Sequence, residues 1–351
     1  MILFRADGNS LIGTGHIMRC LAIADRLKEK CECVFVTADD GPAGLLEGRG
    51  YRNIVLNTDY RSLSEEKDRM KELMETYQPS VVFVDSYFAA PEYFKELKEV
   101  SERVVLATFD DMRKETFPCD ILIHYGIGGE DLKDSYLKRY RKANIRVPEL
   151  LLGGSFTPLR AEFQNLSFRK TRDTVQEILI LTGGADVSNT AADVLKYLSV
   201  HEKYSDRKFH FVVGKLNPFA GEIDKLASEI PNAVVHTDVT NMSGLMTNAD
   251  IAVSAGGTTI MELCACGTPL IAYVCADNQI EGVKNVVKKT GAYYAGDART
   301  NNMLIKDLFS YIDILCKNAD LRSRISKNEQ EEVDGNGAER IAAVLLKYTE
   351  S

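Results

Sequence analysis

The sequence of 351 residues predicts an α/β protein with two domains, each built on a parallel β-sheet that is covered by helices. Short apolar runs alternate with helical patterns along most of the chain. Such uniformly apolar strands are typical of parallel sheets with both faces buried. Glycine-rich or polar turns follow several of the runs, and the length favours about two domains. We expect domains at 1–153 and 154–335, followed by a helical segment at 336–351.

The first strand and the turn behind it are the most distinctive part of the sequence. Ile2–Arg5 predicts a buried strand, and the apolar residues from 17 to 27 follow helical spacing. The turn between them contains Gly13-Thr14-Gly15-His16. Glycine lets a ligand approach the backbone closely, and a helix start offers unpaired N–H groups to an anion. The turn is therefore a candidate binding site.

His16 is the candidate general base of this site. The positive end of the helix dipole disfavours an imidazolium, so a neutral imidazole beside a bound phosphate or sugar could accept a proton. A purely structural histidine is the alternative. A dinucleotide-binding turn is disfavoured, because Met18 stands where that fingerprint requires its third glycine.

The rest of the first half repeats the strand-then-helix pattern. Strands are predicted at 33–37, 53–56, 81–84, 103–107 and 120–123, and helices at 64–77 and 91–100. Ligands of parallel sheets bind beyond the carboxyl ends of the strands. The polar residues collected there are Thr14, His16, Asp85, Tyr87, Asp110, Asp111 and His124. Each aspartate, taken singly, is also an ordinary turn or cap residue.

The second half begins after a predicted hinge at 151–158. Strands are predicted at 177–181, 210–213, 233–236, 250–253 and 269–274, and helices at 190–198, 242–248, 260–265 and 338–348. The residues expected at or just beyond the strand ends are Gly183, Gly184, Asp186, Gly214, Asn278 and Gln279.

A second glycine turn, Ser254-Ala255-Gly256-Gly257-Thr258, opens a helix that carries Glu262. No lysine follows the glycines, so the turn is not a triphosphate-binding P-loop. Its N–H groups could still hold a diphosphate, and Glu262 could accept both hydroxyls of a ribose. The alternative is that Glu262 only complements the helix dipole, which contributes about 0.5 kcal/mol.

Composition excludes several classes of protein. The net charge of −8 and the pI near 5.4 argue against nucleic-acid or anionic-membrane partners. No run is long enough to span a bilayer, and the amino terminus enters a strand directly, so we expect no signal peptide and a cytoplasmic protein. The eight cysteines include Cys31-x-Cys33 and Cys264-x-Cys266, which lack zinc-site spacing. We expect buried thiols rather than disulfides.

Several motifs together resemble one family. They occur in the family's order at Ile12–Arg19, Asp85–Tyr87, Phe109–Asp111, Leu159–Phe163, Gly183–Asp186 and Ser254–Glu262. The chain resembles the PseG-like hydrolases of the pseudaminic acid pathway, which remove UDP from UDP-2,4-diacetamido-2,4,6-trideoxy-β-L-altrose. It is similar also to spore-coat polysaccharide proteins regarded as glycosyltransferases and, more distantly, to MurG. The resemblance covers nearly the whole chain.

The resemblance implies a GT-B fold, with two Rossmann-like domains facing a cleft and a last helix that returns to the first domain. His16 matches the catalytic histidine, Tyr87 the tyrosine facing the sugar and Glu262 the ribose-binding glutamate. The candidate substrate-binding residues on the sugar side are Gly13, Thr14, Gly15, Asp85, Asp110, Asp111, His124 and Arg160. The candidate nucleotide-binding residues are Gly183, Gly184, Asp186, Gly214, Ser254, Gly256, Gly257, Thr258, Glu262, Asn278 and Gln279. The family usually has asparagine in place of His124, so the exact sugar remains open.

The expected reaction replaces UDP by water at the anomeric carbon, with His16 deprotonating the water. UDP-sugar is the expected substrate and UDP the product, with no cofactor and no metal, because no acidic pair with metal-site spacing is required. A glycosyltransferase with an alcohol as nucleophile needs the same base and remains the alternative. A nicotinamide dehydrogenase is disfavoured by Met18, and a non-catalytic binding protein would leave His16 unexplained.

Overall fold

The computed structural model describes residues 1–9, 11–214 and 217–349. The chain forms two compact units, one made of Met1–Ala161 with Asn336–Ser351 and the other of Glu162–Gly335. Residues 154–161 thus belong to unit 1, whereas the sequence predicted a boundary after Gly153. They are held there because Thr157 donates a hydrogen bond to the carbonyl of Tyr125 and because Gly337 fits tightly against the Thr157 backbone.

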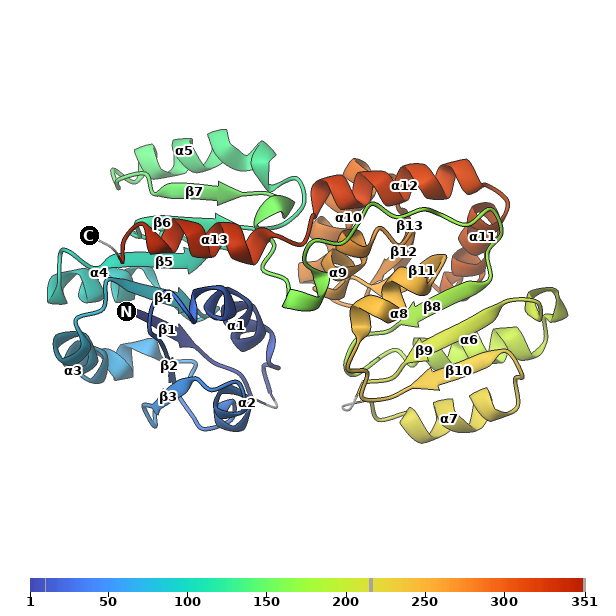
Figure 1. The fold of residues 1–351 in the computed structure, drawn as a ribbon, viewed down its shortest axis with the longest axis horizontal. Coiled ribbons are helices and arrows are strands. Elements are labelled where there is room, and N and C mark those ends of the chain that lie inside the picture. Colours follow the sequence, from blue (N-terminus) through green and yellow to red (C-terminus); the bar gives the residue numbers. More distant parts are fainter. Residues whose placement is uncertain (10, 215–216, 350–351) are drawn as a thin grey trace. The chain divides into compact units, whose positions relative to one another are not determined.

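Unit 1 contains a seven-stranded parallel sheet in the order β3-β2-β1-β4-β5-β6-β7 (Figure 1). Its strands are β1 (Ile2–Ala6), β2 (Cys33–Thr37), β3 (Arg52–Val55), β4 (Val81–Asp85), β5 (Val105–Phe109), β6 (Ile121–His124) and β7 (Glu149–Leu152). Its helices are α1 (Gly15–Leu27), α2 (Ala43–Gly48), α3 (Lys67–Tyr77), α4 (Pro91–Val100), α5 (Lys133–Lys142) and α13 (Gly337–Leu346).

Both faces of this sheet are buried, as the apolar strands predicted. Successive residues of β1 point to opposite faces, so Phe4 packs with α1 and α13 while Leu3 packs with α3 and α4. The helix predicted at 338–348 is α13, which joins the core of unit 1 through Ile341 and Leu345.

Unit 2 contains a six-stranded parallel sheet in the order β10-β9-β8-β11-β12-β13. Its strands are β8 (Glu177–Leu181), β9 (Lys208–Val212), β10 (Ala233–His236), β11 (Ile251–Ala255), β12 (Leu270–Val274) and β13 (Tyr293–Asp297). Its helices are α6 (Thr190–Ser199), α7 (Ala220–Ser228), α8 (Met242–Asn248), α9 (Thr259–Cys266), α10 (Ile280–Thr290), α11 (Leu304–Cys316) and α12 (Ala319–Glu332).

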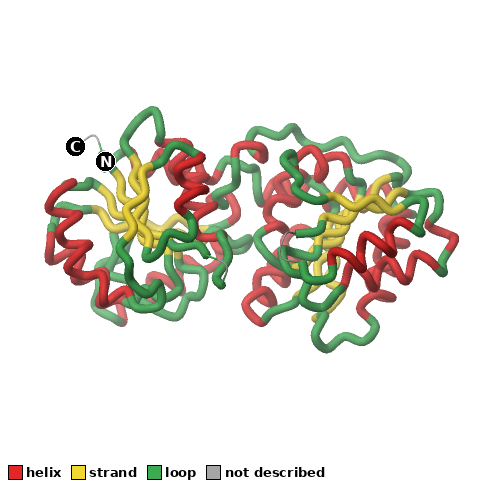
Figure 2. The backbone as a smooth tube through the Cα atoms, turned by 90° about the horizontal axis from the view of Figure 1, so that it is seen from below, coloured by secondary structure: helices red, strands yellow, loops and turns green. Residues whose placement is uncertain are grey.

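Helices lie on both faces of each sheet (Figure 2). In unit 2 a core between the sheet and helices α6, α7 and α11 includes Phe209, Phe211 and Phe309. All eight cysteines are free thiols. Within the part of the chain that the structure describes, no helix has the length and apolarity needed to cross a bilayer.

Candidate functional site

The site of unit 1 is built where the carboxyl ends of β1, β4, β5 and β6 meet the start of α1. Gly13 has a positive φ of 73°, which glycine adopts without strain, and its N–H donates to the Asn9 carbonyl at 2.9 Å. Thr14 precedes α1 and makes no side-chain cap, and Gly15 is the first helical residue. The turn therefore delivers His16 into the first turn of α1, as the sequence predicted.

His16 is buried, with 6% of its surface exposed, and its Nδ1 lies 2.7 Å from Oδ1 of Asp85, the last residue of β4. Arg19 Nη2 is 3.1 Å from the same nitrogen, but a guanidinium can only donate. Nδ1 cannot both accept a hydrogen bond from Arg19 and donate one to Asp85. The Asp85 carboxylate, the nearer partner, can only accept. A proton therefore belongs on Nδ1, so Nε2 is the ring nitrogen that remains for proton exchange with a ligand.

Asp85 is itself held by Arg19. Arg19 Nε donates to Oδ2 at 2.6 Å and Nη2 donates to Oδ1 at 2.5 Å, and Asp85 is only 2% exposed. Although burial disfavours the carboxylate, Arg19 and His16 hold the pKa of Asp85 well below its usual value. Asp85 is thus a permanent anion on the far side of the imidazole from Nε2.

Tyr87 and Asp111 complete the group around His16 and Arg19. The Tyr87 ring stands edge-on to the imidazole with centroids 4.4 Å apart, and 56% of the tyrosine is exposed. Asp111 accepts a hydrogen bond from Arg19 Nη1 at 2.7 Å. The structure therefore brings together His16, Asp85, Tyr87 and Asp111, which the sequence had collected from separate strand ends.

Asp110 and His124 both make hydrogen bonds within unit 1. The Asp110 carboxylate is buried and accepts hydrogen bonds from Arg139 Nη2 and from the Arg113 backbone N–H, both at 2.8 Å. His124 Nδ1 lies 2.8 Å from the Asp110 carbonyl oxygen, to which it donates. Asp110 thus stabilises its own loop rather than offering a free carboxylate. Arg160 is partly buried within unit 1.

Arg19 and Tyr125 are the members of this site that the sequence prediction missed. Arg19 was part of the glycine-histidine motif, but an arginine three residues after a histidine on a helix is usually solvated. Only the positions of the β4, β5 and β6 ends show that its guanidinium is enclosed.

In unit 2 the glycine turn after β11 leads into α9, which begins at Thr259 without a side-chain cap from Thr258. A Cβ on Gly257 would meet nothing within 4 Å, so this part of the turn is open. A Cβ on Gly256 would lie 2.6 Å from Val283, so that glycine permits packing against α10. Glu262 lies in the first turn of α9. The open backbone and the carboxylate are consistent with the predicted anion and ribose contacts.

Three predicted nucleotide-binding side chains of unit 2 are already engaged by the protein. Both carboxylate oxygens of Asp186 accept hydrogen bonds from the first N–H groups of α6, at 2.9 and 3.0 Å. The Ser254 hydroxyl donates to the Ala255 carbonyl, and the Gln279 side-chain oxygen accepts the Cys275 N–H. These hydrogen bonds help to fix the conformation of the loops in which the three side chains lie.

The remaining predicted residues of unit 2 lie in different environments. A Cβ on Gly214 would lie 2.5 Å from the Gly184 carbonyl oxygen, so the β8 and β9 turns approach each other there. Gly183 has a positive φ of 82°. Asn278 is exposed in a short turn before α10.

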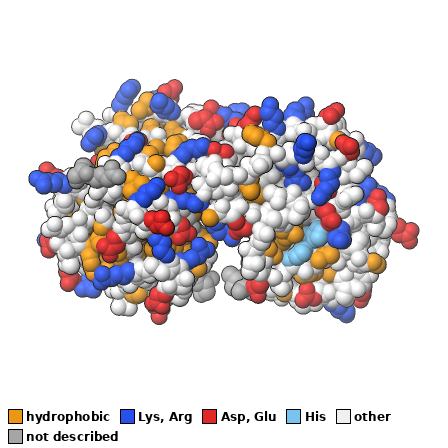
Figure 3. Space-filling view, in the orientation of Figure 1, with side chains coloured by type: hydrophobic (Ala, Val, Ile, Leu, Met, Phe, Trp, Pro, Cys, Tyr) orange, Lys and Arg blue, Asp and Glu red, His pale blue; other side chains and the backbone are white. Residues whose placement is uncertain are grey.

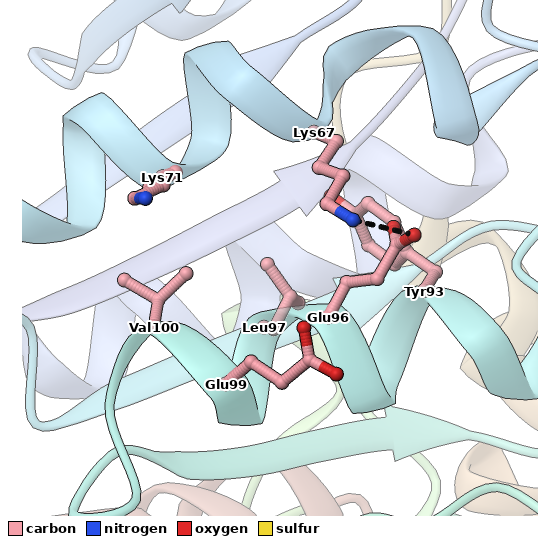
Figure 4. Close-up of a pocket in the computed structure, with 7 residues that line it drawn as sticks. All are labelled: Lys67, Lys71, Tyr93, Glu96, Leu97, Glu99 and Val100. Carbon is pink, nitrogen blue, oxygen red and sulfur yellow. Dashed lines mark hydrogen bonds and ion pairs between the residues drawn. The ribbon is translucent and has the colours of Figure 1, made fainter.

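A separate cavity of about 260 Å³ lies in unit 1 between α3 and α4, and Figure 4 shows the Lys67–Glu96 ion pair, 3.0 Å long, at its edge. It contains none of the predicted site residues. Within the described residues, no cluster of three histidine, cysteine or acidic side chains is arranged to hold a metal.

The two parallel-sheet units define a protein of the GT-B fold class, as predicted. Residues 178–341 match the glycosyltransferase family 28 C-terminal domain. The MurG structure of Acinetobacter baumannii superposes with a TM-score of 0.69 over 99% of both chains at 12% identity, a likeness of fold.

Two curated relatives extend the likeness to the sequence. The chain is 24% identical over 347 residues to the spore coat polysaccharide biosynthesis protein SpsG of Bacillus subtilis, covering 97% of this chain and 96% of the relative. It is also 24% identical over 264 residues to the UDP-2,4-diacetamido-2,4,6-trideoxy-beta-L-altropyranose hydrolase of Campylobacter jejuni, covering 74% and 86%.

Proposed function

We propose that this protein is an enzyme that releases UDP from a UDP-activated sugar, with water as the nucleophile at the anomeric carbon. Unit 2 binds the nucleotide and unit 1 supplies the base. The similarity to the Campylobacter jejuni hydrolase supports a diacetamido-trideoxy sugar as substrate and nonulosonic acid synthesis as the use of the product. The match of residues 178–341, which include most of unit 2, to the glycosyltransferase family 28 C-terminal domain supports the assignment of nucleotide binding to unit 2.

The observation that carries this proposal is the hydrogen bond between His16 Nδ1 and Asp85. With its proton on Nδ1, the imidazole presents Nε2 as the base. Nε2 takes a proton from water as the water oxygen bonds to the anomeric carbon. The bond from that carbon to the UDP oxygen breaks, and UDP leaves with the electron pair. Asp85 stabilises the imidazolium that forms, and general-base assistance of this kind contributes about 10²–10⁴-fold in rate.

In unit 2 we assign the diphosphate to the backbone N–H groups of Thr258 and Thr259, because the Gly257 N–H already donates to the Ala255 carbonyl at 2.9 Å. We assign the ribose hydroxyls to Glu262. The N-terminus of α9 carries partial positive charge, which stabilises the negative charge that develops on the leaving UDP. The open space at Gly257 leaves room for a phosphate near the backbone.

A glycosyltransferase that uses the same base with an alcohol acceptor is the second candidate. Two observations favour it: the match to a glycosyltransferase domain at 178–341, and the similarity over 97% of the chain to a polysaccharide biosynthesis protein.

The test is incubation of the purified protein with a panel of UDP-sugars in H₂¹⁸O without an acceptor, followed by NMR and mass spectrometry. The hydrolase proposal predicts stoichiometric UDP and free sugar, with ¹⁸O in the sugar and none in UDP. UDP release that requires an added alcohol would identify the transferase. Label in UDP would contradict attack at the anomeric carbon, and no UDP release with or without acceptors would overturn both candidates.

A further inference from the structure

Arg19 has an environment that the proposed reaction does not yet explain. It lies one helical turn after His16 on the same face of α1, and only 10% of its side chain is exposed. Its Nε and Nη2 bind the two oxygens of Asp85, at 2.6 and 2.5 Å. Its Nη1 donates to Asp111 at 2.7 Å and to the Tyr125 hydroxyl at 2.8 Å.

These partners come from the ends of three neighbouring strands, β4, β5 and β6. The guanidinium carbon also lies 4.4 Å from the centre of the Phe109 ring. Although burial disfavours a charged guanidinium, Asp111 and Asp85 hold its pKa well above the ordinary value. Arg19 is therefore a fixed cation, and its planar fork matches the carboxylate of Asp85 in a way that lysine cannot reproduce.

The charge balance around His16 follows from this arrangement. Asp85 and Arg19 are its charged neighbours and Tyr87 is the ring against it. Cys20 also contacts Asp85, with its Sγ 3.6 Å from Oδ2. An unpaired carboxylate 2.7 Å from an imidazole would draw a proton onto it, and a protonated histidine cannot serve as a base.

Resting on the proposed function, we propose that Arg19 is a positioning residue. It fixes the Asp85 carboxylate in the orientation that holds the proton on His16 Nδ1. It also neutralises that carboxylate, so that Nε2 stays unprotonated and basic. A merely structural Arg19 would contribute to stability but would not affect the protonation of His16.

Two variants separate the charge of Arg19 from its geometry. Arg19→Gln removes the counter-charge, so the acid limb of the kcat profile should move up by about one pH unit or more. Arg19→Lys keeps a cation without the fork, so the limb should stay near that of the parent while kcat falls by about tenfold or more. Arg5→Lys is the matched control, because Arg5 is another buried arginine with a two-point carboxylate partner, Glu66, but does not contact Asp85 or His16. Its profile should keep the parent shape.

The protonation of the His16 ring provides a second readout, which needs no substrate. Long-range ¹H–¹⁵N spectra of the His16 ring at pH 7 should show a neutral imidazole with its proton on Nδ1, and Arg19→Gln should show a larger imidazolium fraction at the same pH. A parent with its proton on Nε2, or already charged at pH 7, would overturn the proposal. So would an unmoved acid limb and an unchanged imidazolium fraction in Arg19→Gln. If the parent releases no UDP, the proposed function fails, while the ring spectra still decide the role of Arg19.

Discussion

Asp85→Asn is the substitution that most cleanly separates the charge of the site from its shape. Asparagine has nearly the same size and keeps one oxygen that can accept a hydrogen bond. It removes the negative charge that pairs with Arg19 and supplies an amide N–H₂ that can donate to His16 Nδ1. If it donates, the imidazole proton moves to Nε2 and the base is blocked.

The expected cost in stability follows from the contacts. The Arg19 guanidinium loses one of its two buried anions and keeps Asp111, at 2.7 Å. Breaking a buried ion pair from one side costs about 3–5 kcal/mol, and the remaining Asp111 favours the lower end, about 3 kcal/mol. Because Asp85 has a lowered pKa in the folded protein, its stabilising contribution is present above the unfolded value of about 3.9 and is lost as the pH falls below it. The difference in unfolding free energy between the parent and Asp85→Asn should therefore become smaller as the pH falls.

The assays are urea unfolding between pH 3 and 8, UDP release for kcat and calorimetry for UDP affinity. We expect kcat to fall by about 10²–10⁴-fold, with UDP affinity unchanged because we assign the nucleotide to unit 2. Asp120→Asn is the control, because Asp120 also forms an ion pair in unit 1, with Lys98 at 2.7 Å, but precedes β6 at the opposite end of the sheet. An Asp85→Asn variant with parent-like turnover would refute the role given to the carboxylate.

Three further predictions concern unit 2. Glu329 is fully buried, its Oε1 accepts the Leu270 N–H at 3.1 Å, and burial raises its pKa, so folding takes up a proton above the unfolded value of about 4.3. The unfolding free energy of Glu329→Gln should equal that of the parent near pH 4. Above that pH the variant should become more stable than the parent by up to about 1.4 kcal/mol per pH unit. Urea unfolding would measure this, and a difference that does not change with pH would contradict the prediction. Glu262→Ala should weaken UDP binding by about 1.5–3 kcal/mol in calorimetry, and unchanged affinity would exclude the ribose contact. Gly214→Ala should cost about 1–3 kcal/mol of unfolding free energy, whereas Gly184→Ala, whose Cβ would meet nothing within 4 Å, should cost less than about 1 kcal/mol; equal costs would argue against the close approach of the two turns.

The sequence predicted the fold class because nearly all the central strands are continuous apolar runs, and these strands are confirmed. The strands β7 (Glu149–Leu152) and β13 (Tyr293–Asp297) were missed. The apolar end of β7 was assigned to the hinge predicted at 151–158. In β13, an edge strand, glycine and aspartate follow Ala295 and most residues are half-exposed, so its apolar pattern is weak. The predicted helix at 64–77 begins as a 3₁₀ turn, and α3 itself starts at Lys67.

The candidate site was predicted in part. His16 and Asp85 follow strand ends, so the rule for parallel sheets brings them together. Asp110 and Asp186 follow the same rule, but a sequence does not show that Arg139 and the N-terminus of α6 already bind their carboxylates. Arg19 could not be identified from the sequence, because the partners that enclose its guanidinium are more than 60 residues away in the chain.

Histidine side chains also gather over β9 and β10 of unit 2 (Figure 3). His210 Nδ1 lies 2.8 Å from His236 Nε2, and His210 Nε2 lies 2.5 Å from Glu177 on β8. Burial and His210 lower the pKa of His236. These residues follow no glycine turn, and no role in the proposed reaction is assigned to them.

The central claim is that His16 is the general base, and the pH dependence of kcat for His16→Asn tests it most directly. Asparagine keeps a hydrogen-bonding group of similar reach but cannot accept a proton at neutral pH. We predict that kcat falls at least about 100-fold, that the acid limb of the profile disappears and that UDP affinity stays within a few-fold of the parent. Turnover within a few-fold of the parent, with the acid limb intact, would contradict the claim and leave His16 a structural residue.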